Sequence, residues 1–222
     1  MKIGFILAGG TSWRLKPQLE VPKPLLPFGK QTLLELQVNW LLKHGLDKVI
    51  ISTNSEVAQS LPLSLQTNSK VSLVVETTKL GTAGAVKLCL DKFENSVFYV
   101  SNVDDLLLTA NPNVLLELAE KHGSAMFVAK PRMLFGSIHI RGALALRFQE
   151  KPLHKDYCSC GHYAFKVSMV KPLLPAVGSL EYEVLPGLAK QRKLAVSKFK
   201  GAWITINTVR DYLEARNSLV TT

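Results

Sequence analysis

Cysteine is scarce in this chain, and its count argues against a disulfide framework. The 222 residues include only Cys89, Cys158 and Cys160. An odd, sparse set of this kind is typical of a reducing compartment, so we expect a cytoplasmic protein. Cys158 and Cys160 form a C-x-C pair that could bind a soft metal. No second cysteine or histidine pair lies at ligand spacing, which favours incidental thiols.

Long hydrophobic runs are also lacking. No stretch approaches the roughly 20 apolar residues that span a bilayer. The apolar run near the N-terminus is short, and "TSWRLKP" follows it in place of a small-residue cleavage site. We therefore expect neither a signal peptide nor membrane association. Apolar residues still make up 47% of the chain, which is enough to build a core.

Acidic residues are few relative to basic ones. The chain has 27 Lys and Arg against 17 Asp and Glu, a formal net charge of +10. A basic balance of this size favours anionic partners such as nucleotides, sugar phosphates, nucleic acids or acidic membranes. No aromatic-rich RNA motif, zinc finger or helix-turn-helix pattern is present, so we expect no nucleic-acid partner.

Internal repeats and linker-like segments are absent, so we expect a single domain over residues 1–222. Strand-like runs alternate with helix-like periodicity in the first 130 residues, which predicts βαβ units and a mostly parallel sheet. The predicted strands are 2–7, 48–52, 71–76, 97–101 and 125–129, and the predicted helices are 32–43, 82–90 and 111–122.

The pattern changes after residue 130. "GSIHIRGALALRF" predicts a β-hairpin that turns near Arg141-Gly142. Strands at 161–167 and 195–199 and helices at 179–190 and 208–218 follow. The expected fold is a three-layer α/β/α sandwich with a mostly parallel, mixed central sheet, a Rossmann-like first half and antiparallel additions.

The loop after the first strand is glycine-rich and basic. Glycines at 9 and 10 let backbone N–H groups approach phosphate oxygens. Arg14 and Lys23 add positive charge, and prolines stiffen the loop. The loop matches neither a Walker loop nor a dinucleotide fingerprint. It predicts a site for a pyrophosphate-bearing ligand, with a solvated turn-rich connection as the alternative.

The same loop carries a family resemblance. "LAGGTSWRLKP…VPKPLLPFGKQTLLE" resembles the start of the sugar-1-phosphate nucleotidylyltransferases, LAGGxGTRLxP…PKPLLPxxxxPLLE. Further similar motifs follow in order: "ETTKLGTAGAV", "VSNVDDL", "FGS", "RFQEKP", "CSCGHYAF", "SLEYEVLPGLAK" and "GAWITINTVRDYLEA". The chain resembles the compact mannose- or heptose-1-phosphate guanylyltransferases, and also the glucose-1-phosphate thymidylyl- and uridylyltransferases.

The resemblance implies an enzyme that joins an NTP to a sugar 1-phosphate, giving an NDP-sugar and pyrophosphate, with Mg²⁺ as cofactor. Residues 1–130 would form the nucleotide-binding half and residues 131–222 the sugar-phosphate-binding half. The implied catalytic residues are Arg14, Lys23 and Asp104, of which Asp104 is also the metal ligand. The implied nucleotide-binding residues are Leu7, Ala8, Gly9, Gly10, Thr11, Ser12, Trp13, Glu76, Gly81 and Thr82. The implied sugar-phosphate-binding residues are Glu150, Lys151, Ser159, Gly161 and Glu181.

The sequence departs from the family pattern at chemically important positions. Thr205 stands where the family has a second metal-binding Asp, and a neutral hydroxyl is a weak ligand for Mg²⁺. Asp105 adds a carboxylate, although in a strand-like segment it would point away from Asp104. Ser159 replaces an Asn of the sugar pocket, and Trp13 replaces a small Thr beside the phosphates.

Two interpretations remain open. The first is an active nucleotidylyltransferase with a modified metal site, since substrate phosphates and water supply many Mg²⁺ ligands. The second is a catalytically impaired relative that binds nucleotide or NDP-sugar as a regulatory subunit or sensor. The number of retained phosphate-handling motifs favours the first. The motifs select neither base nor sugar, and they leave homo-oligomer formation open.

Overall fold

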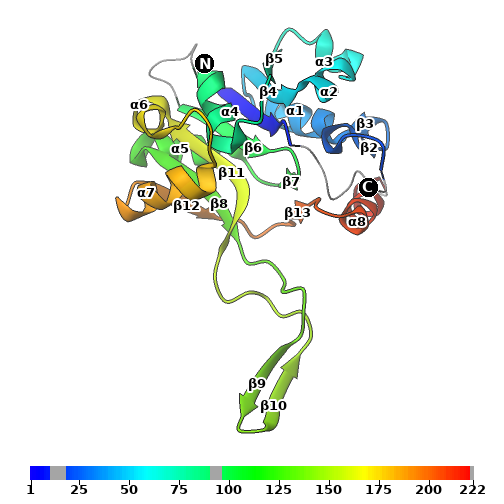
Figure 1. Cartoon of the computed structure of the whole chain (residues 1–222), viewed down its shortest axis with the longest axis vertical. Coiled ribbons are helices and arrows are strands. Elements are labelled where there is room, and N and C mark those ends of the chain that lie inside the picture. Colours follow the sequence, from blue (N-terminus) through cyan, green and yellow to red (C-terminus); the bar gives the residue numbers. More distant parts are fainter. Residues whose placement is uncertain (11–18, 91–96, 221–222) are drawn as a thin grey trace.

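The fold is built on a seven-stranded sheet in the order β12–β8–β11–β6–β1–β4–β5 (Figure 1). The computed structural model describes residues 1–10, 19–90 and 97–220. The strands of this sheet are β1 (Ile3–Ala8), β4 (Lys48–Asn54), β5 (Val71–Glu76), β6 (Val97–Asn102), β8 (Ser124–Ala129), β11 (Cys158–Lys166) and β12 (Leu194–Lys198). All the predicted strands are present, within a few residues of their expected ends.

The sheet is mixed because one strand runs against the others. β1 pairs in parallel with β4 and β6, β4 with β5, and β12 with β8. β11 is antiparallel to both of its neighbours, β6 and β8. The start of β11 therefore lies at the edge of the sheet where β6 and β8 end. The predicted α/β fold with a mixed central sheet is confirmed.

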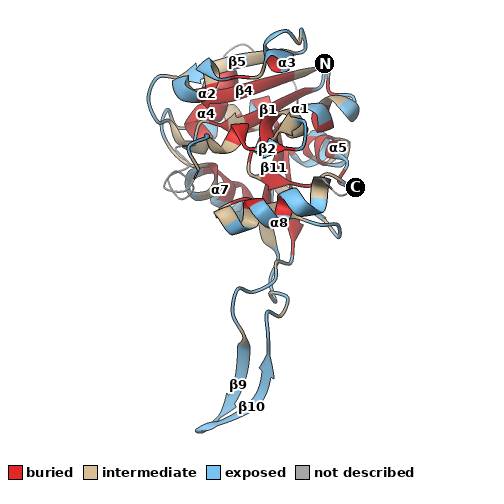
Figure 2. Ribbon diagram, turned by 90° about the vertical axis from the view of Figure 1, so that its right-hand side faces the viewer, coloured by how far each residue is buried: buried red, intermediate tan, exposed pale blue. Residues whose placement is uncertain are grey.

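Helices cover both faces of the sheet, so two hydrophobic cores form. One core joins the sheet to α1 (Leu33–Lys43), α5 (Pro112–His122) and α8 (Val209–Val220). The other joins it to α4 (Gly81–Leu90), α6 (Val167–Val170), the π-helical turn η3 (Leu180–Val184) and α7 (Leu185–Lys190). In the ribbon of Figure 2, the segments coloured as buried lie in the body of the molecule, whereas the hairpin is coloured as exposed.

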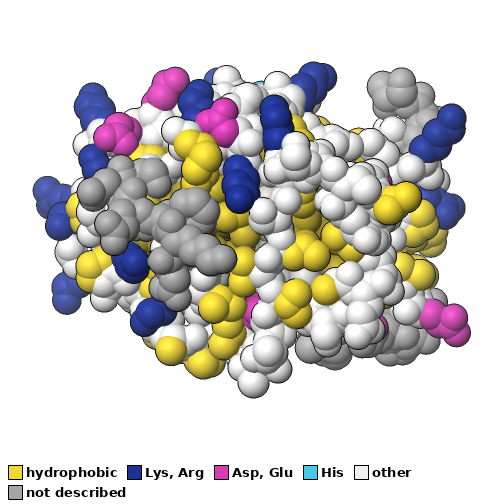
Figure 3. Space-filling model, turned by 90° about the horizontal axis from the view of Figure 1, so that it is seen from above, with side chains coloured by type: hydrophobic (Ala, Val, Ile, Leu, Met, Phe, Trp, Pro, Cys, Tyr) yellow, Lys and Arg dark blue, Asp and Glu magenta, His cyan; other side chains and the backbone are white. Residues whose placement is uncertain are grey.

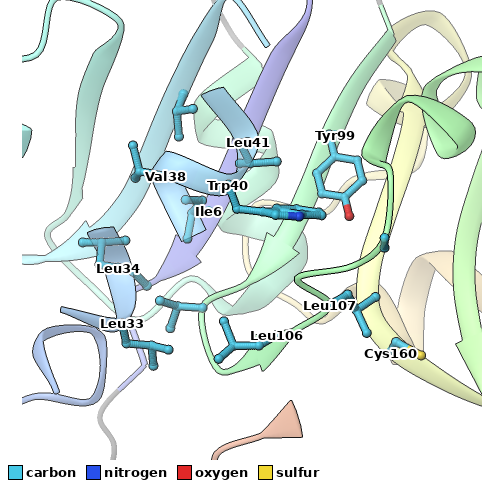
Figure 4. Packing of buried hydrophobic residues seen from close by; sticks show 14 of the residues in the cluster. Ile6, Leu33, Leu34, Val38, Trp40, Leu41, Tyr99, Leu106, Leu107 and Cys160 are labelled. Carbon is cyan, nitrogen blue, oxygen red and sulfur yellow. The ribbon is translucent and has the colours of Figure 1, made fainter. Parts of the chain in front are cut away.

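β1 shows why its sequence is apolar throughout. Ile3 and Phe5 belong to one core, whereas Ile6 and Ala8 belong to the other. Successive side chains of a strand point to opposite faces, so a central strand between two helical layers needs apolar residues at every position. Figure 4 shows Ile6 packed among α1 side chains, with Tyr99 of β6 beside them.

Helix α1 begins and ends as its sequence predicts. The backbone N–H of Thr32 donates to Glu35 Oε2 at 2.7 Å, and the backbone N–H of Glu35 donates to Thr32 Oγ1 at 3.2 Å. This reciprocal capping box satisfies two backbone donors that have no helical partner. After the helix, Gly45 has a φ of 80°, a conformation that glycine adopts without strain.

The helix predicted over 179–190 is divided into the π-helical turn η3 and α7. Pro186 lies in the first turn of α7. Proline has no N–H to donate to the preceding turn, and its ring crowds that turn, so the hydrogen-bond register changes there.

Short elements escaped the sequence prediction, because two to five residues carry too little periodicity to be recognised. They are η1 (Lys23–Leu25), β2 (Pro27–Phe28), β3 (Gln31–Thr32), α2 (Ser55–Gln59), α3 (Leu63–Gln66), β7 (Asp105–Leu106), η2 (Lys171–Leu173) and β13 (Ile204–Thr205).

A two-stranded hairpin extends away from the body (Figures 1 and 2). β9 (Ser137–Arg141) and β10 (Leu144–Gln149) pair antiparallel, and Gly142 in the turn has a φ of 58°. The predicted hairpin is confirmed, but its position far from the sheet was not predicted. We call residues 130–157, which leave the body after β8 and return at β11, the arm.

Two of the sequence observations can be compared with the structure directly. Cys89, Cys158 and Cys160 are all free thiols. Among the helices of the described residues, none combines the length and the apolar character required to cross a bilayer.

Candidate active site

A cavity of about 340 Å³ opens at the carboxyl ends of β1 and β6. Ligands of open α/β sheets bind at this edge, and the volume is in the usual range for small-molecule sites. The cavity is lined by Leu7, Ala8, Gly9, Gly10, Lys23, Pro24, Glu76, Lys79, Gly81, Thr82, Ala85, Asn102, Val103 and Asp104. Segments from the first half of the chain thus converge on one space.

Lys23 and Asp104 form an ion pair on the cavity wall. Lys23 Nζ donates to Asp104 Oδ2 at 2.9 Å, and the two side chains are 15% and 26% exposed. Lys23 begins the short helix η1, where Pro24 follows it and restricts the backbone. The site therefore offers a positive charge and a carboxylate side by side, partly shielded from water.

Two buried side chains hold the loop that carries Asp104. Gln37 Nε2 donates to the carbonyl oxygens of Asn102 at 3.0 Å and Asp105 at 2.7 Å. His162 Nε2 lies 2.8 Å from the same Asp105 carbonyl oxygen, and its Nδ1 lies 2.7 Å from the Tyr99 hydroxyl. The carbonyl oxygen cannot donate, so Nε2 carries a proton, and in the neutral ring Nδ1 then accepts from the Tyr99 hydroxyl.

Burial explains the neutral state of that ring. It lowers the pKa of His162 to about 4, because the charged imidazolium would lose its hydration. Sequence reasoning missed the role of Gln37. The signal was a polar residue on the apolar face of "LLELQVNWLLK", a position that needs a buried hydrogen-bond partner.

Asp105 is buried and does not line the cavity. Its Oδ1 accepts from Trp203 Nε1 at 2.9 Å, and its Oδ2 accepts from Asn102 Nδ2 at 3.3 Å. Burial, with repulsion from Asp104, raises the pKa of Asp105 to about 6. Thr205 is its register partner across β7 and β13. The extra carboxylate thus stabilises the loop that carries Asp104, through contacts outside the cavity.

Gly161 makes room for that carboxylate. It has a φ of 70°, and a Cβ atom built there would overlap Asp105 Oδ2. Gly81, at the start of α4, has a φ of 73°, and a Cβ there would overlap the carbonyl oxygen of Gly178. Both positions need glycine for conformation and for space.

Glu76 closes the cavity at the end of β5. Its Oε1 accepts from Ser52 Oγ at 2.9 Å, and its Oε2 accepts from the backbone N–H of Leu80 at 3.4 Å. A Cβ atom at Gly9 would lie 2.6 Å from Oε1. Glu76 therefore lies against Gly9 and is hydrogen-bonded to Leu80, the residue before α4.

A chain of hydrogen bonds joins α4 to the second half of the protein. Thr82 Oγ1 donates to Glu181 Oε2 at 2.8 Å, and the Tyr163 hydroxyl donates to Glu181 Oε1 at 3.2 Å. Ser159 Oγ lies 3.0 Å from the Tyr163 hydroxyl. The side chains that the sequence assigned to the sugar side at 159 and 181 thus connect directly to the edge of the cavity.

The remaining two sugar-side residues lie elsewhere. Glu150 and Lys151 are on the arm and do not line the cavity. Lys151 has a φ of 45°. Its carbonyl oxygen accepts from Arg132 Nη1 at 3.4 Å, which joins the returning segment of the arm to the outgoing one.

The structure brings most of the predicted nucleotide and catalytic residues together around the cavity. They are Leu7, Ala8, Gly9, Gly10, Lys23, Glu76, Gly81, Thr82 and Asp104. Thr11, Ser12, Trp13 and Arg14 lie outside the described residues. The prediction overlooked Lys79, an exposed side chain on the cavity rim, although it lies within the quoted motif "ETTKLGTAGAV".

Basic side chains also occur away from the cavity. Lys and Arg are spread over the face seen in Figure 3, with hydrophobic side chains between them. The net charge of +10 is therefore a property of the wider surface. A positive surface of this kind raises the local concentration of phosphate-bearing ligands.

The residues of the cavity can hold a divalent cation only together with a ligand. Within the described ranges, no group of three His, Cys, Asp or Glu side chains could hold a metal by itself. Asp104 and Glu76 are the two carboxylates on the lining. Mg²⁺ is often bound by one or two carboxylates with substrate phosphates and water, so this donor set fits such a shared site.

Comparison with known proteins identifies the family. The nucleotidyl transferase family model matches residues 3–222. The chain belongs to this family. The family expected from the sequence motifs is thereby confirmed.

One similar protein is the mannose-1-phosphate guanyltransferase of Pichia angusta, which is 30% identical over 226 residues. The match covers 95% of this chain but 62% of the relative, so this nucleotidyl transferase domain spans less than two thirds of that protein.

Solved structures share the fold. HddC from Yersinia pseudotuberculosis has a TM-score of 0.76 and 24% identity, with 98% of this chain and 99% of that chain covered. A second HddC structure, complexed with GMP-PN, gives the same TM-score and coverage at 22% identity.

Proposed function

We propose that this protein transfers a nucleotidyl group from an NTP to a sugar 1-phosphate, giving an NDP-sugar and pyrophosphate. The observation that carries the proposal is the Lys23–Asp104 pair, 2.9 Å apart on a cavity lined by Gly9, Gly10 and the start of α4. Nucleotidyl transfer needs positioned reactants and charge stabilisation rather than a covalent intermediate. This cavity supplies both.

Each group on the nucleotide side has a proposed task. The glycine turn and the N-terminal end of α4 present backbone N–H groups to the triphosphate. Lys23 offsets the charge that develops on the α-phosphate while the sugar phosphate oxygen attacks in line and pyrophosphate leaves. Arg14 contacts the departing phosphates, and Lys79 adds positive charge at the rim.

Asp104 is the proposed ligand of Mg²⁺. When bound, the metal would act as a Lewis acid that polarises phosphate oxygens. The ion pair holds the Asp104 carboxylate at the cavity wall beside the amine that faces the α-phosphate. Gln37 and His162 keep the loop in place through the backbone, so the carboxylate is positioned before substrate arrives.

On the sugar side, we assign sugar-phosphate contacts to Ser159, Gly161 and Glu181, with Glu150 and Lys151 supplied by the arm. Residues 1–130 and 131–222 are then the two halves of one domain. We further propose that the protein works in the cytoplasm, which its three free thiols support.

The names of the relatives suggest the first substrates to test. The Pichia angusta relative is named for guanylyl transfer to mannose 1-phosphate, and one HddC structure contains GMP-PN. We therefore rank GTP first among the nucleotides.

The test is pyrophosphate release in a panel of four NTPs and several sugar 1-phosphates with Mg²⁺. We expect release with at least one pair, and none when the sugar phosphate is omitted. If no pair releases pyrophosphate while an NDP-sugar raises the melting temperature, the protein is a binding-only relative and the proposed reaction is wrong.

A further inference from the structure

The arm carries a hydrophobic face that is exposed along both of its strands. Every residue of β9 and β10 is exposed. Ile138 pairs with Phe148 across the two strands, and these side chains are 50% and 64% exposed. Ile140, on the same face, is 63% exposed. A two-stranded hairpin is at best marginally stable in water unless its apolar face is covered.

The opposite face of the hairpin is mainly polar and basic. His139 pairs with Arg147, Ser137 pairs with Gln149, and Arg141 pairs with the one leucine on this face, Leu144. Side chains directly opposite each other in a ladder share one face, so the hairpin is amphipathic. This alternation is typical of an antiparallel ribbon with one buried face and one solvent-exposed face.

The total accessible surface supports a missing partner. The chain exposes 12453 Å² for a mass of 24.5 kDa. A folded monomer of this mass exposes roughly 10,000 Å². The excess is larger than the roughly 800 Å² per partner that a stable protein–protein interface buries.

The cavity and the arm complement each other. The proposed sugar-side residues Glu150 and Lys151 lie on the arm and outside the cavity lining. Beside the cavity, the segment that carries Glu181 exposes two large apolar side chains, Val177 at 64% and Tyr182 at 85%. Glu181 and Glu183 lie there too, opposite in charge to the basic arm.

The arm is long enough to reach another molecule. A chain extended from Lys130 to Arg141 spans about 40 Å at roughly 3.3 Å per residue. A second copy of this chain offers both an apolar and acidic surface for the hairpin and a cavity whose lining lacks Glu150 and Lys151.

We propose that two copies exchange arms in a two-fold symmetric dimer. Each arm lays its apolar face on the surface around Val177 and Tyr182 of the other copy and brings Glu150 and Lys151 to that copy's cavity. Such an interface is isologous, so both active sites are completed at once. The role of these two residues rests on the proposed function, whereas the exchange itself does not.

The first experiment measures mass by light scattering over a range of concentrations. We expect a dimer, with Ile140→Asp and Phe148→Asp each weakening dimerisation at least about 30-fold because a charge replaces a buried apolar anchor. The matched control is His139→Asp on the polar face, which leaves the dimer intact. A wild-type monomer at all concentrations would overturn the proposal.

The second experiment mixes two defective variants. Lys23→Ala disables the cavity, and Lys151→Ala disables the arm. In a mixed dimer, one site has an intact cavity and receives an intact arm, so an equal mixture after subunit exchange recovers about one quarter of wild-type activity. If the arm served only its own cavity, the mixture would stay as inactive as its components.

The two experiments separate this proposal from the proposed function. If no substrate pair releases pyrophosphate, the mixing test has no signal, but the mass measurement still decides the exchange. A monomer that sediments with phosphatidylglycerol vesicles, and loses that binding in Phe148→Asp, would assign the arm to a lipid surface and overturn the exchange.

Discussion

The cavity and the arm both carry motif residues, but they are held in place in different ways. Around the cavity, Asp104 sits on a loop tied down by the buried side chains Gln37 and His162. On the arm, Glu150 and Lys151 are exposed, and the Lys151 carbonyl oxygen accepts from Arg132 of the outgoing segment of the same arm. Burial thus fixes the geometry of one motif, whereas the other depends on what the arm meets.

The largest difference between the two regions should be in turnover. We expect Asp104→Asn to lower kcat by about 10²-fold or more, because in the proposed reaction it removes a preorganised charge beside the phosphates. The matched change on the arm is Asp156→Asn, an exposed carboxylate that should leave kcat within about two-fold. The measurement is pyrophosphate release at saturating substrates. Equal losses in the two variants would remove the distinction.

The next difference concerns glycine. Gly161→Ala should lower the free energy of unfolding by about 3 kcal/mol, because the φ of 70° disfavours a side chain and the new Cβ overlaps Asp105. Gly142→Ala on the arm has a similar φ of 58° but open space around it. That variant should cost only about 1–2 kcal/mol, from backbone strain alone. Urea denaturation measures both, and equal costs would show that backbone strain, not packing, dominates at Gly161.

The smallest difference should be seen in pH dependence. The pKa of His162 is lowered to about 4, so between its unfolded pKa near 6.5 and pH 4 the unfolded state binds the extra proton. The contribution of His162 to the free energy of unfolding is therefore largest above pH 6.5, and it decreases as the pH is lowered. Between pH 7 and 5 the loss is about 2 kcal/mol.

The measurement is the difference in unfolding free energy between wild type and His162→Gln at pH 7 and pH 5. The difference isolates this one group, because most other titrations cancel in it. A constant difference for His162→Gln would mean that the pKa of this ring is the same in the folded and unfolded states.

The sequence was sufficient for much of the fold and for one side of the site. Continuous apolar strands and helical periodicity predicted the sheet and its principal helices. A strand buried between two helical layers needs apolar residues at every position, so it can be recognised from the sequence. Lys23 and Asp104 were selected from their motifs, and the position of Asp104 just past the end of β6 predicted that it lies at the carboxyl edge of the sheet.

Other features depend on contacts between residues that are far apart in the sequence, and local sequence patterns predict such contacts poorly. Gln37 and His162 reach the Asp104 loop from far along the chain, and only a polar residue on an apolar helix face pointed to one of them. The hairpin itself was predicted, but its direction was not, because a two-stranded ribbon is oriented by whatever covers its apolar face.

The register between β8 and β11 gives the arm a low cost in chain entropy. Ala129 and Cys158 are direct partners in the sheet, so the arm is a 28-residue loop (130–157) whose two ends are already joined. Closing a loop of this length instead of a four-residue turn costs only about 2 kcal/mol, because the cost grows with the logarithm of length. Arms of very different length could therefore be inserted at this point while the sheet and the cavity beside it stay folded.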